Sequence, residues 1–123
     1  MVKKEDNEFI SKNTERLIFF FILFILICHI MGCFWIFIAD MSLSENFVAT
    51  DGTIQNYNWI TVNEYDNYTN IQMYTIAFYF TVTTITTVGY GDISGHNSTE
   101  RFICIIMMIC GVVLFSLISS SIT

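Results

Sequence analysis

The sequence predicts an all-α membrane protein in which two spanning helices flank a shorter, re-entrant half-helix. Apolar residues make up 54% of the 123-residue chain and charged residues only 13%, which departs widely from the averages of soluble domains. Two uncharged segments, 17–39 and 102–123, can cross a hydrocarbon core of about 30 Å at about 1.5 Å per residue. Between them, the apolar segment 72–85 is too short and too rich in threonine to make a third crossing.

The length allows one domain, residues 1–123, which hydropathy and charge divide further. In chain order we expect a cytoplasmic lead-in (1–16), an outer transmembrane helix (17–40), an extracellular turret (41–71), the half-helix (72–85), a tight segment (86–92) and an inner transmembrane helix (98–123). The turret is polar and without a clear period, so we expect it to be irregular and exposed.

The distribution of basic residues predicts the orientation. Four bases precede the first span, whereas residues 17–100 contain no Lys or Arg; the four are Lys3, Lys4, Lys12 and Arg16. Because basic residues are retained on the cytoplasmic side, both termini should be cytoplasmic and segment 40–100 should lie outside. We expect an integral protein of the plasma membrane.

Two sequons fall in the outer segment, at Asn67 and Asn97, and both are candidate glycosylation sites. Asn67 should be used more readily, because Asn97 lies close to the membrane. The outer segment also carries seven acids: Asp40, Glu45, Asp51, Glu64, Asp66, Asp92 and Glu100. They form either a solvated loop face or, repeated around a symmetric mouth, a field that concentrates cations.

The tight segment carries the most specific motif, Thr87-Val88-Gly89-Tyr90-Gly91, directly after the half-helix. This string matches the TVGYG selectivity filter of potassium channels. A dehydrated potassium ion needs oxygens in place of its water shell, and backbone carbonyls of four chains can supply them. Aiming successive carbonyls at one axis requires backbone angles that alternate in sense, so we expect positive φ at the two glycines. Thr87 can add its hydroxyl, and Tyr90 should pack behind the filter and hold its width.

Flanking residues narrow the resemblance. The run 29–35, the pair Trp59-Ile60 and the pair Glu100-Arg101 resemble channels of the cyclic-nucleotide-binding-domain superfamily, which includes the ether-à-go-go and plant inward-rectifying channels. Members normally carry a voltage sensor before the pore and a nucleotide-binding domain after it, and neither is recognisable here. A segment of a longer polypeptide and a two-span channel both stay open, and the gating stimulus is not specified.

The resemblance implies a function without catalysis. It implies a homotetramer or heterotetramer that conducts K⁺ passively and selectively, with a filter formed by residues 87–91. It also implies membrane lipids as neighbours, no nucleic-acid partner, and no cofactor besides the permeant ion. Two alternatives stay open: a non-selective cation pore and a non-conducting subunit that modulates partner channels.

Two further positions have competing interpretations. Gly111 lies 20 positions after Gly91, where potassium channels commonly place a gating hinge, but a small residue there can also serve close helix packing. His29 and Cys33 share a helix face and could hold a metal. Since one His and one Cys make half a site at best, we expect no metal there.

Overall fold

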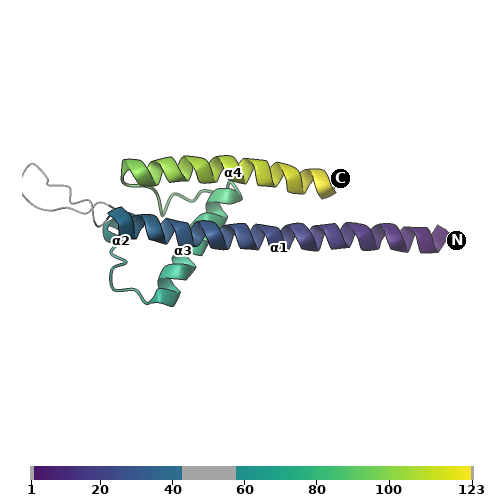
Figure 1. Ribbon diagram of the computed structural model, residues 1–123, viewed down its shortest axis with the longest axis horizontal. Helices are drawn as coiled ribbons and strands as arrows, with labels where there is room; N and C mark the ends of the chain where they lie inside the picture. Colours follow the sequence, from purple (N-terminus) through teal and green to yellow (C-terminus); the bar gives the residue numbers. More distant parts are fainter. Residues whose placement is uncertain (1, 43–57, 123) are drawn as a thin grey trace, which may run out of the picture.

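The computed structural model describes residues 2–42 and 58–122, which contain four helices and no strand. Helices α1 (Val2–Ser42) and α4 (Ser98–Ile122) are long and apolar enough to cross a membrane, whereas α2 (Trp59–Val62) and α3 (Asn70–Ile85) are shorter. Figure 1 shows α1 and α4 side by side with α3 oblique to both, and each of these three helices contacts the other two. The prediction of an all-α protein with two membrane-spanning candidates is therefore confirmed.

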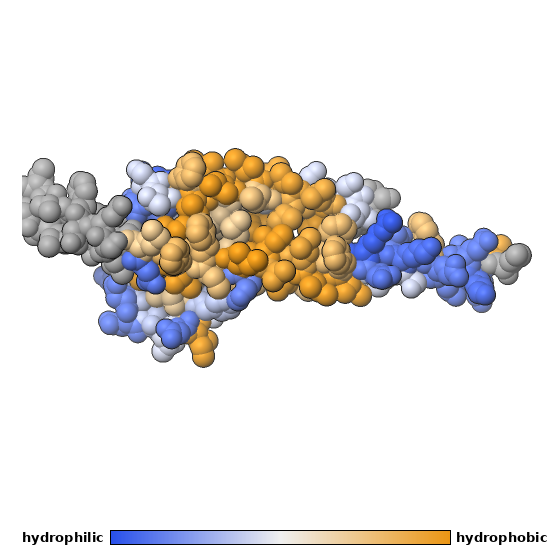
Figure 2. All heavy atoms as spheres, viewed as in Figure 1, coloured by the Kyte–Doolittle hydropathy of each residue, from blue (hydrophilic) through white to orange (hydrophobic). Residues whose placement is uncertain are grey.

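Helix α1 has 41 residues, about 60 Å at 1.5 Å per residue, roughly twice the thickness of a hydrocarbon core. It contains the expected outer helix, 17–40, and also most of the lead-in, which continues the same helix. The chain lacks proline and its first glycine is Gly32, so nothing in the lead-in breaks the helix. In Figures 1 and 2 the N-terminal end of α1 projects beyond α4, and most of the projecting part is hydrophilic on the face shown.

Helix α3 begins with a capping box. The hydroxyl of Thr69 accepts the Gln72 amide, and the Gln72 side chain accepts the Thr69 amide. This cap starts the helix two residues before the expected half-helix, 72–85. Threonine hydroxyls, which would be costly in an apolar environment, bond back to carbonyls three or four residues earlier. They belong to Thr75, Thr81, Thr83, Thr84 and Thr86.

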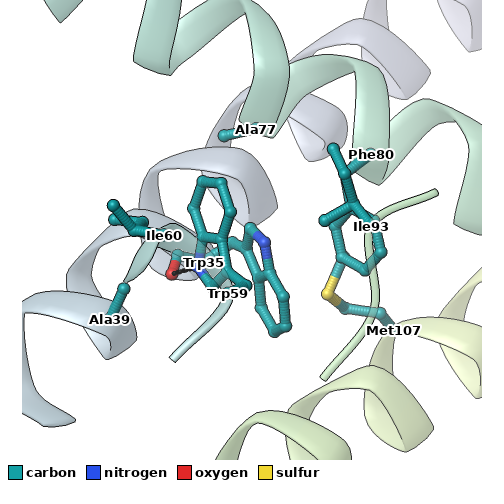
Figure 3. Close-up of a cluster of buried hydrophobic side chains, with 8 residues drawn as sticks. All are labelled: Trp35, Ala39, Trp59, Ile60, Ala77, Phe80, Ile93 and Met107. Atoms are coloured by element: carbon teal, nitrogen blue, oxygen red, sulfur yellow. Dashed lines mark hydrogen bonds between the residues drawn. The ribbon is translucent and has the colours of Figure 1, made fainter. Parts of the chain in front are cut away.

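The buried core lies where α1, α2, α3 and α4 meet and is built around an aromatic stack (Figure 3). Trp35 of α1 stacks on Trp59 at 5.7 Å between ring centroids and on Phe80 at 4.6 Å. The Trp59 indole N–H also donates to the Trp35 carbonyl. The expectation of an irregular, exposed turret is therefore wrong at Trp59, because aromatic packing draws that residue into the core. Residues 43–57 of the expected turret lie outside the described residues.

Candidate functional site

The segment after α3 is held against the end of that helix by backbone hydrogen bonds. The Thr87 amide donates to the Thr84 carbonyl at 3.2 Å, and the Gly89 amide donates to the Thr83 carbonyl at 3.0 Å. These bonds turn the chain at the C-terminal end of α3, so residues 87–91 begin close to that end of the helix. The C-terminal end of a helix carries partial negative charge, which favours a cation at this point.

Positive φ recurs at every second residue of this segment. It is 63° at Thr87, 56° at Gly89 and 79° at Gly91, whereas Val88 and Tyr90 between them have no positive φ. The prediction of positive φ at the two glycines is confirmed. Positive φ at Thr87 was not foreseen, because a β-branched residue disfavours it by about 1–2 kcal/mol. A backbone that alternates in this way can turn successive carbonyl groups toward the same side.

The side chains of this segment are open to solvent in the single chain. Residues 87–92 are all exposed, with Val88 55% and Tyr90 72% exposed. Tyr90 was expected to pack behind the filter, but in the single chain its ring is not buried. The packing that we expected is therefore absent from one chain, and any cover over the Tyr90 ring has to come from outside the described residues.

A side-chain hydrogen bond ties the outer end of the segment to α3. The Tyr79 hydroxyl donates to Asp92 Oδ2 at 2.9 Å, and Asp92 Oδ1 accepts the Ile93 amide. The bond to the Asp92 carboxylate raises the pKa of Tyr79, because losing the phenolic proton would remove the donor and place two negative charges together. Sequence reasoning did not foresee this pair, and the only available signal was an acid directly after Gly91.

Gly111 is buried where α4 meets the base of α3. A Cβ atom added there would lie 2.9 Å from both the Cα and the carbonyl oxygen of Ile85, closer than side chains normally approach backbone. Helix α4 continues without interruption through this position. The contact favours the interpretation of Gly111 as a close-packing residue, while the gating hinge stays a prediction.

Glu100 was expected to be one of the exposed outer acids, but its position in the structure is different. Its side chain is fully buried, and its two carboxylate oxygens accept the backbone amides of Trp59 and His96. The expectation that Glu100 belongs to a solvated loop face or to the field at the mouth is therefore wrong. The acids Glu45 and Asp51 lie outside the described residues.

The two sequons lie in different environments. Asn67 is exposed in the segment between α2 and α3. Asn97 is partly buried before α4, and its side-chain oxygen accepts the Glu100 amide at 2.8 Å, as an N-cap residue does.

His29 of α1 contacts α3. Its Nδ1 lies 2.6 Å from the Tyr74 hydroxyl, and its Nε2 lies 4.0 Å from the Cys33 sulfur. Within residues 2–42 and 58–122, no three His, Cys, Asp or Glu side chains gather in a group that could hold a metal.

Comparison with known proteins assigns this arrangement to a family. The model of a family described as "Ion channel" matches residues 46–123, more than half of the chain. The chain belongs to the ion channel family. The chain is also similar to the voltage-gated delayed rectifier potassium channel KCNH5 of Homo sapiens, at 24% identity over 138 residues that cover 99% of this chain and 14% of the relative.

Two further relatives are channels of invertebrates. The potassium voltage-gated channel protein eag of Drosophila melanogaster is 26% identical over 134 residues, covering 100% of this chain and 11% of the relative. The potassium voltage-gated channel unc-103 of Caenorhabditis elegans is 29% identical over 108 residues, covering 76% of this chain and 12% of the relative. The chain thus spans only about a seventh or less of the length of the relatives it matches.

Proposed function

We propose that this chain forms the pore of a potassium-selective channel and conducts K⁺ passively as a tetramer. The observation that carries the proposal is the positive φ at Thr87, Gly89 and Gly91, in a segment that follows a short apolar helix between two spanning-length helices. Four copies of residues 87–91 around one axis would supply rings of carbonyl oxygens that replace the hydration shell of K⁺. Membership of the ion channel family and the names of the relatives support the choice of ion.

The exposure of the filter supports assembly. Val88 and Tyr90 are exposed apolar and aromatic side chains that the single chain leaves uncovered. In a tetramer, neighbouring copies would cover them and bring four filters to the axis. In this arrangement α3 is a re-entrant pore helix that enters the membrane from the outer side, and the filter after it returns to that side. Helix α1 faces outward toward lipid, and α4 lines the pore.

The charge pattern supports the orientation that we propose. Lys12 and Arg16 stand at the start of the apolar part of α1, on the side expected to be cytoplasmic, while Asp92 is exposed after the filter. An acid at that place, repeated in four copies, would raise the local concentration of cations at the outer mouth. Residence in the plasma membrane, with both termini cytoplasmic, belongs to the same proposal. So do gating at Gly111 and a glycan at Asn67 or Asn97.

Reversal-potential measurements test this function. Purified protein in a planar bilayer, with K⁺ on one side and Na⁺ on the other, should give a current that reverses near the potassium equilibrium potential. Equal passage of both ions would overturn selectivity and favour the non-selective cation pore. If the protein is a monomer on a sizing column and gives no current in the bilayer, the result would favour the non-conducting subunit instead.

A further inference from the structure

Glu100 connects α4 to the segment directly before it and to α2, whose first residue lies 41 residues earlier in the sequence. It lies in the first turn of α4 and is 0% exposed. Its Oε1 accepts the amide of Trp59, the first residue of α2, at 3.1 Å. Its Oε2 accepts the amide of His96 at 3.0 Å. His96 lies in the post-filter segment, residues 92–97, so one carboxylate joins α2, the post-filter segment and α4.

This position requires two acceptor atoms. Each carboxylate oxygen of Glu100 faces a different backbone N–H, and the N-terminal end of α4 adds a favourable partial positive charge. Glutamine has nearly the same shape but offers one acceptor oxygen and one NH₂ donor. In Glu100→Gln, one of the two backbone amides would therefore lose its acceptor and face another donor in a buried site.

The post-filter segment is fixed at several other points, so it has little freedom to absorb a movement of His96. Asp92 is bonded to Tyr79, and Ile93 is buried in the core. A Cβ atom at Gly95 would lie 2.9 Å from the Arg101 amide nitrogen, so the segment lies directly on the backbone of α4. A displacement at His96 would therefore strain the contacts of Asp92 and Ile93, which directly follow Gly91.

We propose that Glu100 is a positioning residue for the filter. Its carboxylate fixes the post-filter segment and α2 to α4, and so keeps residues 87–91 in their alternating conformation. This inference rests on the proposed function of those residues as the filter. This role differs from that of an exposed acid that attracts cations to the outer mouth, because Glu100 is buried and both its carboxylate oxygens accept backbone amides.

Hydrogen exchange and ion selectivity, measured on the full chain in the membrane, test the inference. In Glu100→Gln, the amide of Trp59 or His96 should exchange at least about tenfold faster, because it loses a hydrogen bond to a charged group. The Gly89 amide, which donates to Thr83, should also exchange faster. The permeability of Na⁺ relative to K⁺ should rise.

Asp66→Asn is the matched control. It removes the same charge from an exposed acid of the outer segment, and it should change neither amide exchange nor selectivity. Unchanged exchange at Trp59, His96 and Gly89 in Glu100→Gln would overturn the inference. Faster exchange at Trp59 or His96 with an unaltered Gly89 amide and unaltered selectivity would also overturn it, because Glu100 would then hold α2 or the post-filter segment without affecting residues 87–91.

The role of Glu100 can still be tested if the wild type carries no current or if Glu100→Gln does not assemble. A wild-type protein without current would contradict the proposed function, and exchange at Gly89 would then decide the role of Glu100 by itself. If Glu100→Gln does not assemble, Glu100→Asp replaces it, because aspartate keeps two acceptors but is shorter by one methylene. Its Gly89 amide should exchange faster than in the wild type, and an unchanged rate would count against the inference.

Discussion

Gly111 of α4 and Ile85 at the end of α3 approach so closely that there is no room for a side chain between the two backbones. Ile85 lies two residues before Thr87, so α4 touches the chain just before the proposed filter. This contact gives any movement of α4 a direct route to the filter. It also makes Gly111 the point at which gating and packing can be separated by experiment.

We expect Gly111→Ala to destabilise the protein by about 1–3 kcal/mol, because the new methyl group must displace the Ile85 backbone. Gly32→Ala is the matched control, since its methyl group would meet α3 at an ordinary contact distance of 3.6 Å. Thermal unfolding of the tetramer and single-channel open probability measure the two effects. Higher stability of Gly111→Ala, combined with an altered open probability, would favour a hinge without close packing.

Tyr79→Phe should loosen the outer end of the filter. It removes the hydroxyl that donates to Asp92 and leaves that carboxylate oxygen without its side-chain donor. We expect more frequent non-conducting periods in single-channel records, with the tetramer intact. Tyr68→Phe removes the hydroxyl of another exposed tyrosine and should leave the records unchanged. Identical records from both variants would contradict the role of this hydrogen bond.

The same pair predicts a dependence on alkaline pH. Hydrogen bonding to Asp92 raises the pKa of Tyr79 above its ordinary value of 10.0. The stabilising bond should therefore be fully present below about pH 10 and be lost as the pH rises through the raised pKa. Thermal stability of the wild type, measured at increasing pH, should fall in this range. Tyr79→Phe should lack this component of the fall, and an equal fall in both proteins would refute the assignment.

Gly89→Ala should abolish K⁺ current or admit Na⁺. Among the described residues of one chain, leaving out Gly89 and its two neighbours, no atom lies within 4 Å of a Cβ added at Gly89, so the backbone conformation and not crowding within the chain would cause the effect. A left-handed residue with a side chain costs about 1–2 kcal/mol, and the tetramer repeats this cost four times at one axis. A sizing column should still show the tetramer. Wild-type selectivity in Gly89→Ala would show that positive φ at this position is dispensable.

Glycosylation should favour Asn67 over Asn97. Asn67 is exposed, whereas Asn97 is partly buried and caps α4. A glycosidase-sensitive mobility shift should disappear in Asn67→Gln and persist in Asn97→Gln. The asparagine is the residue to change at the first sequon, because Thr69→Ala would also remove the cap of α3. The reverse pattern of shifts would overturn the ranking.

The sequence by itself determined the features that depend on local chemistry. Uninterrupted apolar segments predicted the two spanning candidates, because hydrophobic length is a property of consecutive residues. The short motif at residues 87–91 predicted positive φ at Gly89 and Gly91, because glycine pays no steric penalty there. It could not predict positive φ at Thr87, since the side chain disfavours that conformation and only the surrounding structure imposes it.

Tertiary structure decided which distant residues meet. The charge of Glu100 predicts an exposed side chain, yet helix packing brings it to the amide of Trp59, 41 residues away. The same packing places Gly111 against Ile85 and draws Trp59 onto Trp35. Such contacts depend on how α1, α2, α3 and α4 lie against one another, which residue type and periodicity do not encode.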